Sequence, residues 1–300
     1  MGRTARKQAV LIAGPTASGK SALALATARR TGAVIINADA MQVYDVLRVV
    51  TARPSPEEMR EAPHRLYGTV PPGVRFSTGD WLRAVAALLD ETDLAGRPLL
   101  FVGGTGLYFE ALLRGFAEVP AVPAAITRQV EAEVAGLDRA GREQLLAARD
   151  PLMAARLQAH DPQRVVRALA VLEATGRSLA AFQDEARPGV LAGFEIERLV
   201  LNPERSVLRE RIARRFAAML ESGAVEEVEA LLGLGLDASL PAMKAIGVRE
   251  IADWLAGETT QEEAIARAVT ATRQYAKRQR TWMRNRMSDW AWIDPPMPGR

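Results

Sequence analysis

The fold is decided by the stretch Gly14-Pro15-Thr16-Ala17-Ser18-Gly19-Lys20-Ser21. An apolar run at residues 9–13, typical of a buried strand, comes before it, and a helical pattern begins at Ser21. Glycines let the backbone turn its N–H groups inward, and the first turn of a helix adds partial positive charge, so the stretch is typical of a P-loop. Lys20 supplies a cation for phosphate oxygens, and Ser21 supplies a hydroxyl for a phosphate or a metal ion. We therefore expect residues 14–21 to bind a phosphate or diphosphate.

The composition excludes several classes of protein. With 48 % hydrophobic and 25 % charged residues, the chain has the balance of an ordinary globular protein. It contains no cysteine, which excludes disulfides, thiolate zinc sites and a cysteine nucleophile. Its two histidines, His64 and His160, lie far apart and favour structural roles over a metal centre. No signal peptide or run of about 18 apolar residues is present, so we expect a cytoplasmic protein without a membrane span.

Strand and helix patterns alternate outward from the P-loop. They occur at residues 33–37, 56–61, 78–89, 98–102, 107–113 and 195–201. This alternation favours an α/β fold, with a P-loop NTPase-like core whose parallel sheet is flanked by helices. Ligands bind at the carboxyl ends of such strands, where Asp39 and Thr105 lie. Asp39 is therefore a candidate general base, although a loop or helix-capping aspartate is an equal alternative from this position alone.

The pattern changes between residues 119 and 189. No strand pattern occurs there, and helical segments rich in alanine, leucine and arginine replace it. We interpret residues 119–189 as an all-helical insertion domain, within a core domain formed by residues 1–118 and 190–300. After residue 204 the chain is again helical, and it ends in a long helix from about residue 260 to residue 286.

The strand at residues 98–102 is followed by Gly103-Gly104-Thr105-Gly106. P-loop nucleotidases usually have an aspartate at such a strand end, which holds Mg²⁺. Here the strand is followed by Gly103, and Thr105 offers a hydroxyl in the region where the acid is expected. The sequence therefore disfavours hydrolysis of a nucleoside triphosphate as the main reaction, and it leaves diphosphate binding intact.

The long C-terminal helix has a basic face. Residues 264–288 include no acidic residue, and bases recur at helical spacing at Arg273, Lys277, Arg280 and Arg284. Exposed helix faces usually mix charges of both signs, so this one favours nucleic-acid contact over the alternative of a merely solvated surface. A second, weaker basic patch is formed by Gln163, Arg164, Val165, Val166 and Arg167, in which helical spacing places Val165 on the core face.

Several ordered motifs cover nearly the whole chain. They are GPTASGKS (14–21), NADAMQVY (37–44), APHRL (62–66), VGGTGLYFEALL (102–113), DPQRVVRALAVLEATGRSL (161–179), PAMKAIGVREI (241–251) and TRQYAKRQRTW (272–282). In this order the motifs resemble those of the tRNA dimethylallyltransferases. The resemblance implies transfer of a dimethylallyl group from dimethylallyl diphosphate to N6 of adenosine 37, next to the tRNA anticodon. It also implies a Mg²⁺ requirement and a helical insertion that contacts the anticodon stem-loop. We expect a monomer.

The resemblance also implies roles for individual residues. Asp39 matches the general base, and Thr105 matches the threonine that contacts the diphosphate. Lys20 and the P-loop amides hold the leaving diphosphate, Ser21 contacts Mg²⁺ indirectly, and Arg249 matches an arginine placed over the diphosphate. The implied tRNA-contacting residues are Asp39, Ala40, Met41, Gln42, Gln163 through Arg167, Lys244 through Arg249, Arg273, Lys277, Arg280 and Arg284. The family commonly has serine where this chain has Ala40.

Two other functions are compatible with a P-loop. A small-molecule or nucleoside kinase would use ATP at residues 14–21, but the missing strand-end aspartate and the acid-free helix count against it. A regulatory nucleotide-binding RNA protein without catalysis fits the charge distribution, but it gives no task to Asp39 and Thr105.

Overall fold

The computed structural model describes residues 7–94, 96–158, 161–185 and 188–294. The chain divides into two compact units, one formed by residues 1–110 and 191–300 and the other by residues 111–190. The second unit begins within a helix, α4 (Gly106–Arg114), and not at residue 119 as the change in sequence pattern indicated. His160 lies outside the described residues.

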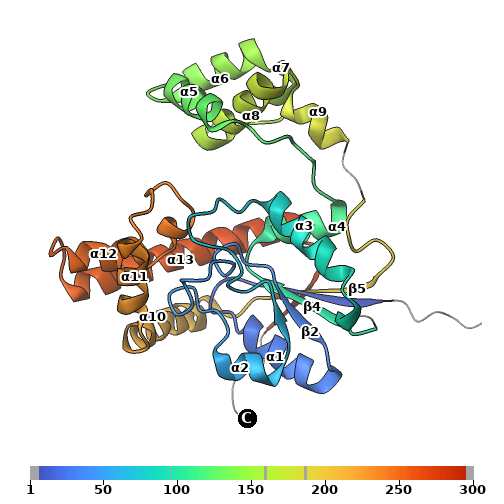
Figure 1. Ribbon diagram of the computed structural model, residues 1–300, viewed down its shortest axis with the longest axis vertical. Helices are drawn as coiled ribbons and strands as arrows, with labels where there is room; N and C mark the ends of the chain where they lie inside the picture. Colours follow the sequence, from blue (N-terminus) through green and yellow to red (C-terminus); the bar gives the residue numbers. More distant parts are fainter. Residues whose placement is uncertain (1–6, 95, 159–160, 186–187, 295–300) are drawn as a thin grey trace, which may run out of the picture. The chain divides into compact units, whose positions relative to one another are not determined.

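The core unit is built on a parallel six-stranded sheet, as expected for a P-loop fold (Figure 1). The strand order is β3-β2-β4-β1-β5-β6. In chain order the strands are β1 (Gln8–Ala13), β2 (Val34–Asn37), β3 (His64–Arg65), β4 (Leu99–Gly103), β5 (Glu195–Leu201) and β6 (Ala291–Ile293). The sequence pattern predicted neither β3 nor β6, because strands of two and three residues are too short to show periodicity.

Helices cover both faces of this sheet. Besides α4, the core unit contains α1 (Lys20–Thr31), α2 (Pro56–Glu61), α3 (Thr78–Leu89), α10 (Arg205–Glu221), α11 (Ala224–Gly233), α12 (Val248–Leu255) and α13 (Gln261–Arg286). Leu25 of α1 packs with Ile12 and Leu100, which belong to the buried central strands. Trp81 of α3 is fully buried and donates its indole N–H to the Asn37 carbonyl at the end of β2 (2.9 Å). Burial of long apolar strands between helices explains why their sequences read as continuous apolar runs.

The C-terminal ends of the central strands form one edge of the sheet. In the β1–β4 register Ala13 lies opposite Gly103, and in the β2–β4 register Asn37 lies opposite Val102. The P-loop, the loop after β2 and the turn after β4 therefore start side by side. Helix α13 packs against both α10 and α12, and it begins at a capping box formed by Thr260 and Glu263.

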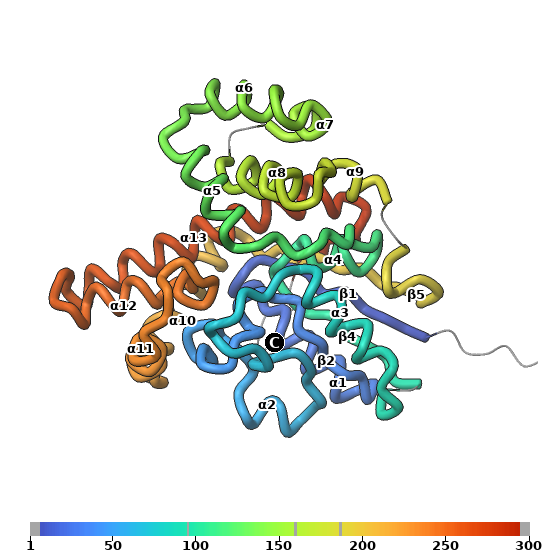
Figure 2. The backbone as a smooth tube through the Cα atoms, turned by 45° about the horizontal axis from the view of Figure 1, so that its top comes forward, coloured from blue at the N-terminus to red at the C-terminus, as the bar shows by residue number. Residues whose placement is uncertain are grey.

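The other unit is helical throughout its described residues (Figure 2). Its helices are α5 (Ala124–Val134), α6 (Arg139–Arg149), α7 (Pro151–Ala154), α8 (Pro162–Thr175) and α9 (Leu179–Asp184). They enclose a core of their own, in which Val130, Leu146 and Leu169 are buried. In neither unit does the structure describe a helix that is both long and apolar enough to cross a membrane.

Candidate active site

The P-loop connects β1 to α1 in a tight turn. Ser18 donates its backbone N–H to the Pro15 carbonyl (3.1 Å), and both Ala17 and Gly19 have positive φ, 63° and 95°. A Cβ atom on Gly14 would lie 2.6 Å from Ser18 Oγ, so the loop passes too close for a side chain there. This compact turn places backbone N–H groups at the N-terminus of α1, the arrangement that binds anions.

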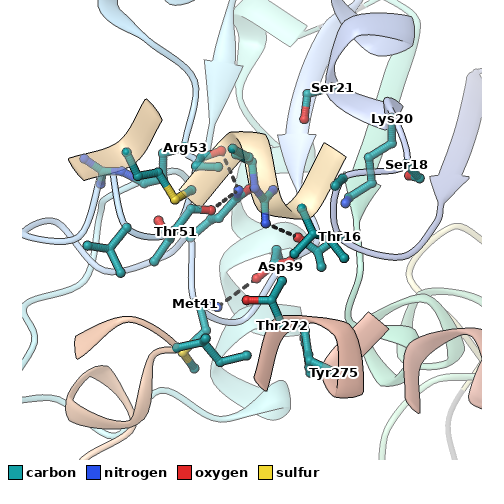
Figure 3. Close-up of a pocket in the computed structure, with 18 of the residues that line it drawn as sticks. Thr16, Ser18, Lys20, Ser21, Asp39, Met41, Thr51, Arg53, Thr272 and Tyr275 are labelled. Carbon is teal, nitrogen blue, oxygen red and sulfur yellow. Dashed lines mark hydrogen bonds between the residues drawn. The ribbon is translucent and has the colours of Figure 1, made fainter. Parts of the chain in front are cut away.

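A cavity of about 960 Å³ opens beside this loop, lined by residues from several elements (Figure 3). Lys20 and Ser21 reach it from α1, Asp39 from the loop after β2, and Thr272 and Tyr275 from α13. Its apolar lining is formed by Leu23, Val50, Ile212, Phe216, Met219 and Ile246. The cavity therefore combines an anion-binding loop, a carboxylate and an apolar wall.

Asp39 is held by the loop that follows β2. The Asn37 side chain, which is fully buried, accepts a hydrogen bond from the Asp39 N–H (2.9 Å) and donates one to the Asp39 carbonyl (3.0 Å). The Asp39 carboxylate accepts at Oδ1 from the Met41 N–H (3.0 Å). No described residue donates a hydrogen bond to Oδ2, so this oxygen is available to accept a proton in the cavity.

Thr105 lies against the same loop, although it does not line the cavity. Its N–H donates to the Ala38 carbonyl (3.2 Å), and its Oγ1 accepts from the Ala40 N–H (2.9 Å). A hydroxyl that accepts one hydrogen bond retains its proton for donation. Thr105 therefore fixes the backbone on one side of Asp39 and still has an O–H group to offer a ligand. Ala40 takes part through its backbone, which needs no side-chain hydroxyl.

Two buried cations face Asp39. Burial lowers the pKa of Lys20 to about 8; Asp39 opposes this shift, and the neighbouring positive charge of Arg215 adds to it. Burial also lowers the pKa of Arg215, again opposed by Asp39. Arg215 donates to Thr16 Oγ1 in the P-loop (2.6 Å), and Arg211 donates to the Ser18 carbonyl (3.4 Å). The site therefore holds more buried positive than negative charge, as binding of a diphosphate requires.

The sequence predicted neither Arg211 nor Arg215 as a site residue. Both lie on α10, more than 190 residues from their P-loop partners. Helix α10 is rich in arginine along its whole length, and nothing in its pattern distinguishes the two that turn towards the cavity from those that face solvent. Only the packing of α10 beside the P-loop identifies them.

Arg249 does not occupy the place expected of it. Its side chain is 86 % exposed, its Nε lies 4.0 Å from Asp253 Oδ2, and it does not line the cavity. Val248 and Ile251 form the buried face of α12, which directs Arg249 to the opposite side. The structure thus corrects the expectation that Arg249 lies over the diphosphate, since the arginine beside the P-loop is Arg215.

The predicted RNA-contacting residues of the core unit lie in two places. Ala40, Met41, Gln42 and Lys244 line the cavity beside Asp39. On α13, Arg273, Lys277 and Arg284 are exposed, and Arg280 is half-buried. No described acidic residue forms an ion pair with these four, whereas Arg267 and Arg286 of the same helix have acidic partners. Burial and the charges of Arg284 and Arg205 lower the pKa of Arg280. The basic face of α13 is therefore uncompensated.

The predicted RNA-contacting residues of the helical unit lie on α8. Gln163, Arg164 and Arg167 are exposed, and Val166 is half-buried. Val165 is fully buried in the core of this unit, so its side chain is not available to RNA. Its burial follows from the helical spacing that placed it on the core face.

Neither the described histidine nor a metal cluster adds chemistry to the site. His64 Nδ1 lies 2.8 Å from the Ala62 carbonyl, and burial lowers the pKa of the ring. Among the described residues, no three His, Asp or Glu side chains come together as a metal site. A metal ion in this cavity would therefore depend on ligand oxygens in addition to Ser21 and Asp39.

Comparison with known proteins gives consistent matches. Residues 42–286 match a family model described as IPP transferase, and residues 7–70 match one described as isopentenyl transferase. The chain is 55 % identical over 289 residues to a tRNA dimethylallyltransferase of Methylobacterium sp., covering 96 % of this chain and 94 % of the relative. It is 54 % identical over 291 residues to a tRNA dimethylallyltransferase of Allorhizobium ampelinum, covering 96 % and 95 %.

Solved structures show the same similarity. The full-length tRNA isopentenylpyrophosphate transferase of Bacillus halodurans is 33 % identical, with a TM-score of 0.67, covering 96 % of this chain and 90 % of that one. A eukaryotic dimethylallyltransferase acting on tRNA is 26 % identical, with a TM-score of 0.80, covering 96 % of this chain and 74 % of that one.

Proposed function

This chain belongs to the IPP transferase family, and from its site we propose how it acts as a tRNA dimethylallyltransferase. It transfers the dimethylallyl group of dimethylallyl diphosphate to N6 of adenosine 37 in tRNA. The observation that carries this function is the meeting of the P-loop, two buried cations and the Asp39 carboxylate around one cavity with an apolar wall. A kinase would not need that wall, and a regulatory binding protein would not need the carboxylate.

The P-loop amides, Lys20 and Arg215 bind the diphosphate. In the reaction the bond between C1 of the dimethylallyl group and the diphosphate oxygen breaks, and the electron pair leaves with the oxygen. Buried cations next to that oxygen stabilise the developing charge more strongly than cations in water do. Arg215 takes the role that the sequence assigned to Arg249. The apolar wall near Phe216 and Ile246 accommodates the dimethylallyl group.

Asp39 receives the proton. As the adenine N6 forms its bond to C1, it must lose one hydrogen, and the free Oδ2 of Asp39 accepts it. Adenine is a weak nucleophile, so much of the acceleration comes from holding N6 and C1 in line. Thr105 positions the Asp39 loop through Ala40, and its hydroxyl proton is available to the diphosphate near the bridging oxygen.

The residues present fit a Mg²⁺ ion that is bound mainly through the diphosphate. Mg²⁺ commonly binds one or two protein oxygens together with substrate phosphates. Ser21 faces the cavity at the start of α1 and is the residue that would contact the ion, directly or through water. When bound, Mg²⁺ would supply additional positive charge to the leaving diphosphate.

The tRNA contacts both units. In the core unit, Ala40 through Gln42 and Lys244 lie beside the position of the target base, and the basic face of α13 contacts backbone phosphates. Arg249, being exposed, is available to RNA and not to the diphosphate. In the helical unit, Gln163, Arg164 and Arg167 contact the anticodon stem-loop. The target adenosine leaves its stack to reach the cavity, as for other enzymes that modify bases. The protein acts as a monomer in the cytoplasm.

The test is direct. Purified protein is incubated with unmodified tRNA, dimethylallyl diphosphate and Mg²⁺, and the tRNA is digested to nucleosides and analysed by mass. We expect N6-dimethylallyladenosine at position 37, and none in a tRNA with guanosine at that position. Absence of the product, or incorporation of phosphate from ATP instead, would refute the assignment.

A further inference from the structure

Gln279 is a buried polar residue of α13 that joins two loops of the site. Its side chain is in a residue only 6 % exposed, and its Oε1 accepts a hydrogen bond from the Thr16 N–H (2.8 Å). Its Nε2 donates to the Gly104 carbonyl (3.0 Å). Because a backbone N–H only donates and a carbonyl only accepts, these two partners determine the orientation of the amide.

Both partners belong to the reaction centre. Thr16 is a P-loop residue whose hydroxyl also accepts a hydrogen bond from Arg215. Gly104 directly precedes Thr105, which holds the loop of Asp39. A Cβ atom on Gly104 would lie 2.1 Å from Gln279 Nε2, so the absence of a side chain there allows the amide to reach the carbonyl. One side chain thus links the loop that binds diphosphate to the turn beside the general base.

The opposite face of the same helical turn is basic. Lys277 is exposed and Arg280 is half-buried, and neither forms an ion pair with a described residue, whereas Gln279 between them faces the protein interior. A helix moves as a rigid element over such a short distance. Phosphates bound to Lys277 and Arg280 would therefore restrict the position of the Gln279 amide as well.

We propose that Gln279 is a positioning residue that couples RNA binding on α13 to diphosphate binding in the P-loop. The inference rests on the proposed roles of these two sites. RNA restrains α13, Gln279 restrains the Thr16 amide, and the P-loop then loses less conformational freedom when diphosphate binds. Because coupling between two binding sites is reciprocal, diphosphate strengthens RNA binding by the same factor.

The test uses Gln279→Met, which keeps the side-chain length and removes both hydrogen bonds. The control is Gln261→Met, an exposed glutamine on the same helix, away from the site. For each protein, the Kd of inorganic diphosphate is measured with and without saturating tRNA, and the Kd of tRNA is measured alone. Hydrogen exchange of the Thr16 amide reports directly on the bond to Gln279.

We expect tRNA to improve diphosphate binding in the wild-type protein at least about fivefold more than in Gln279→Met, the lower end of usual coupling factors. The Thr16 amide should exchange faster in Gln279→Met, and the Kd of tRNA alone should change by less than about twofold. Gln261→Met should behave as wild type. A decrease in melting temperature alone would be a structural effect and would not produce this difference.

Equal improvement by tRNA in wild type and Gln279→Met overturns the inference, whatever the melting temperature. If Gln279→Met does not fold, Gln279→Glu replaces it, because it keeps the acceptor for Thr16 and removes the donor to Gly104 at neutral pH. It should also reduce the coupling. If wild-type protein does not bind inorganic diphosphate at all, the assignment of the P-loop fails, and the inference fails with it.

Discussion

Replacement of Arg215 is the sharpest test of how the site holds its leaving group. Arg215 is buried beside the P-loop, donates to Thr16 Oγ1 at 2.6 Å, and has further N–H groups for the cavity. Arg215→Gln keeps a polar side chain that can reach the threonine, but it removes the charge. Hydrogen bonds to charged groups contribute about 1.5–3 kcal/mol, which corresponds to a loss of diphosphate affinity of about 10- to 150-fold.

The effect on rate should be larger than the effect on binding. Negative charge increases on the leaving oxygen in the transition state, and loss of one such donor lowers rates by about 10²–10³. We therefore expect kcat as well as diphosphate affinity to fall in Arg215→Gln. Binding is measured by calorimetry with inorganic diphosphate in the absence of tRNA, and kcat by dimethylallyl incorporation at saturating substrates.

Arg249→Gln is the matched control. Its guanidinium is 86 % exposed and 4.0 Å from Asp253, so its replacement should change diphosphate affinity by less than about twofold. The protein fold should survive Arg215→Gln, because the change removes a buried cation that lies near another, Lys20. Unchanged diphosphate binding in Arg215→Gln, or a large loss in Arg249→Gln with Arg215 intact, would refute this account of the site.

Three further results are expected. Asp39→Asn should lower kcat by about 10²–10⁴ while tRNA affinity stays nearly unchanged, and near-normal turnover would mean that another group accepts the proton. Lys277→Ala combined with Arg280→Ala should weaken tRNA binding and flatten its salt dependence by about 0.7–0.9 log units per lost phosphate contact, whereas an unchanged slope would show a merely solvated surface. Because the pKa of Lys20 is lowered to about 8, kcat/KM for dimethylallyl diphosphate should fall as the pH rises through about 8. Unfolded chains retain the proton up to the ordinary lysine value of 10.5, so folding stability should increase over the same range, and a parallel loss of both would point to unfolding instead.

The central sheet could be predicted from the sequence because its strands are long and buried. The runs that form β1, β2 and β4 are apolar almost throughout, and each is followed by a loop that carries a site residue. The buried stripe of α13, with Ala268, Ala276 and Met283, also follows helical spacing. Local patterns of this kind record burial, and burial is a property that each segment encodes on its own.

Contacts between distant elements could not be predicted in the same way. Arg215 and Gln279 reach the P-loop from helices far along the chain, and both are single polar residues within helices of mixed composition. Helical spacing places Gln279 on the inner face of α13, but it does not say which loop lies opposite. The same ambiguity produced the assignment of Arg249, whose motif lies near the cavity through Lys244 while its own side chain points away.

The missing strand-end aspartate has a steric reason besides its chemical one. From the sequence, Gly103 indicated only that no carboxylate holds a metal ion at this point. In the structure, a Cβ atom on Gly103 would lie 1.9 Å from the Ala38 carbonyl oxygen, and the Thr105 N–H donates to that same oxygen. An aspartate at position 103 would displace the loop that carries Asp39. The close approach of these two strand ends therefore excludes a metal-binding carboxylate and, by the same contact, places the general base beside the P-loop. A transferase whose leaving group brings its own phosphate oxygens to the metal can dispense with that carboxylate, whereas it cannot dispense with the position of Asp39.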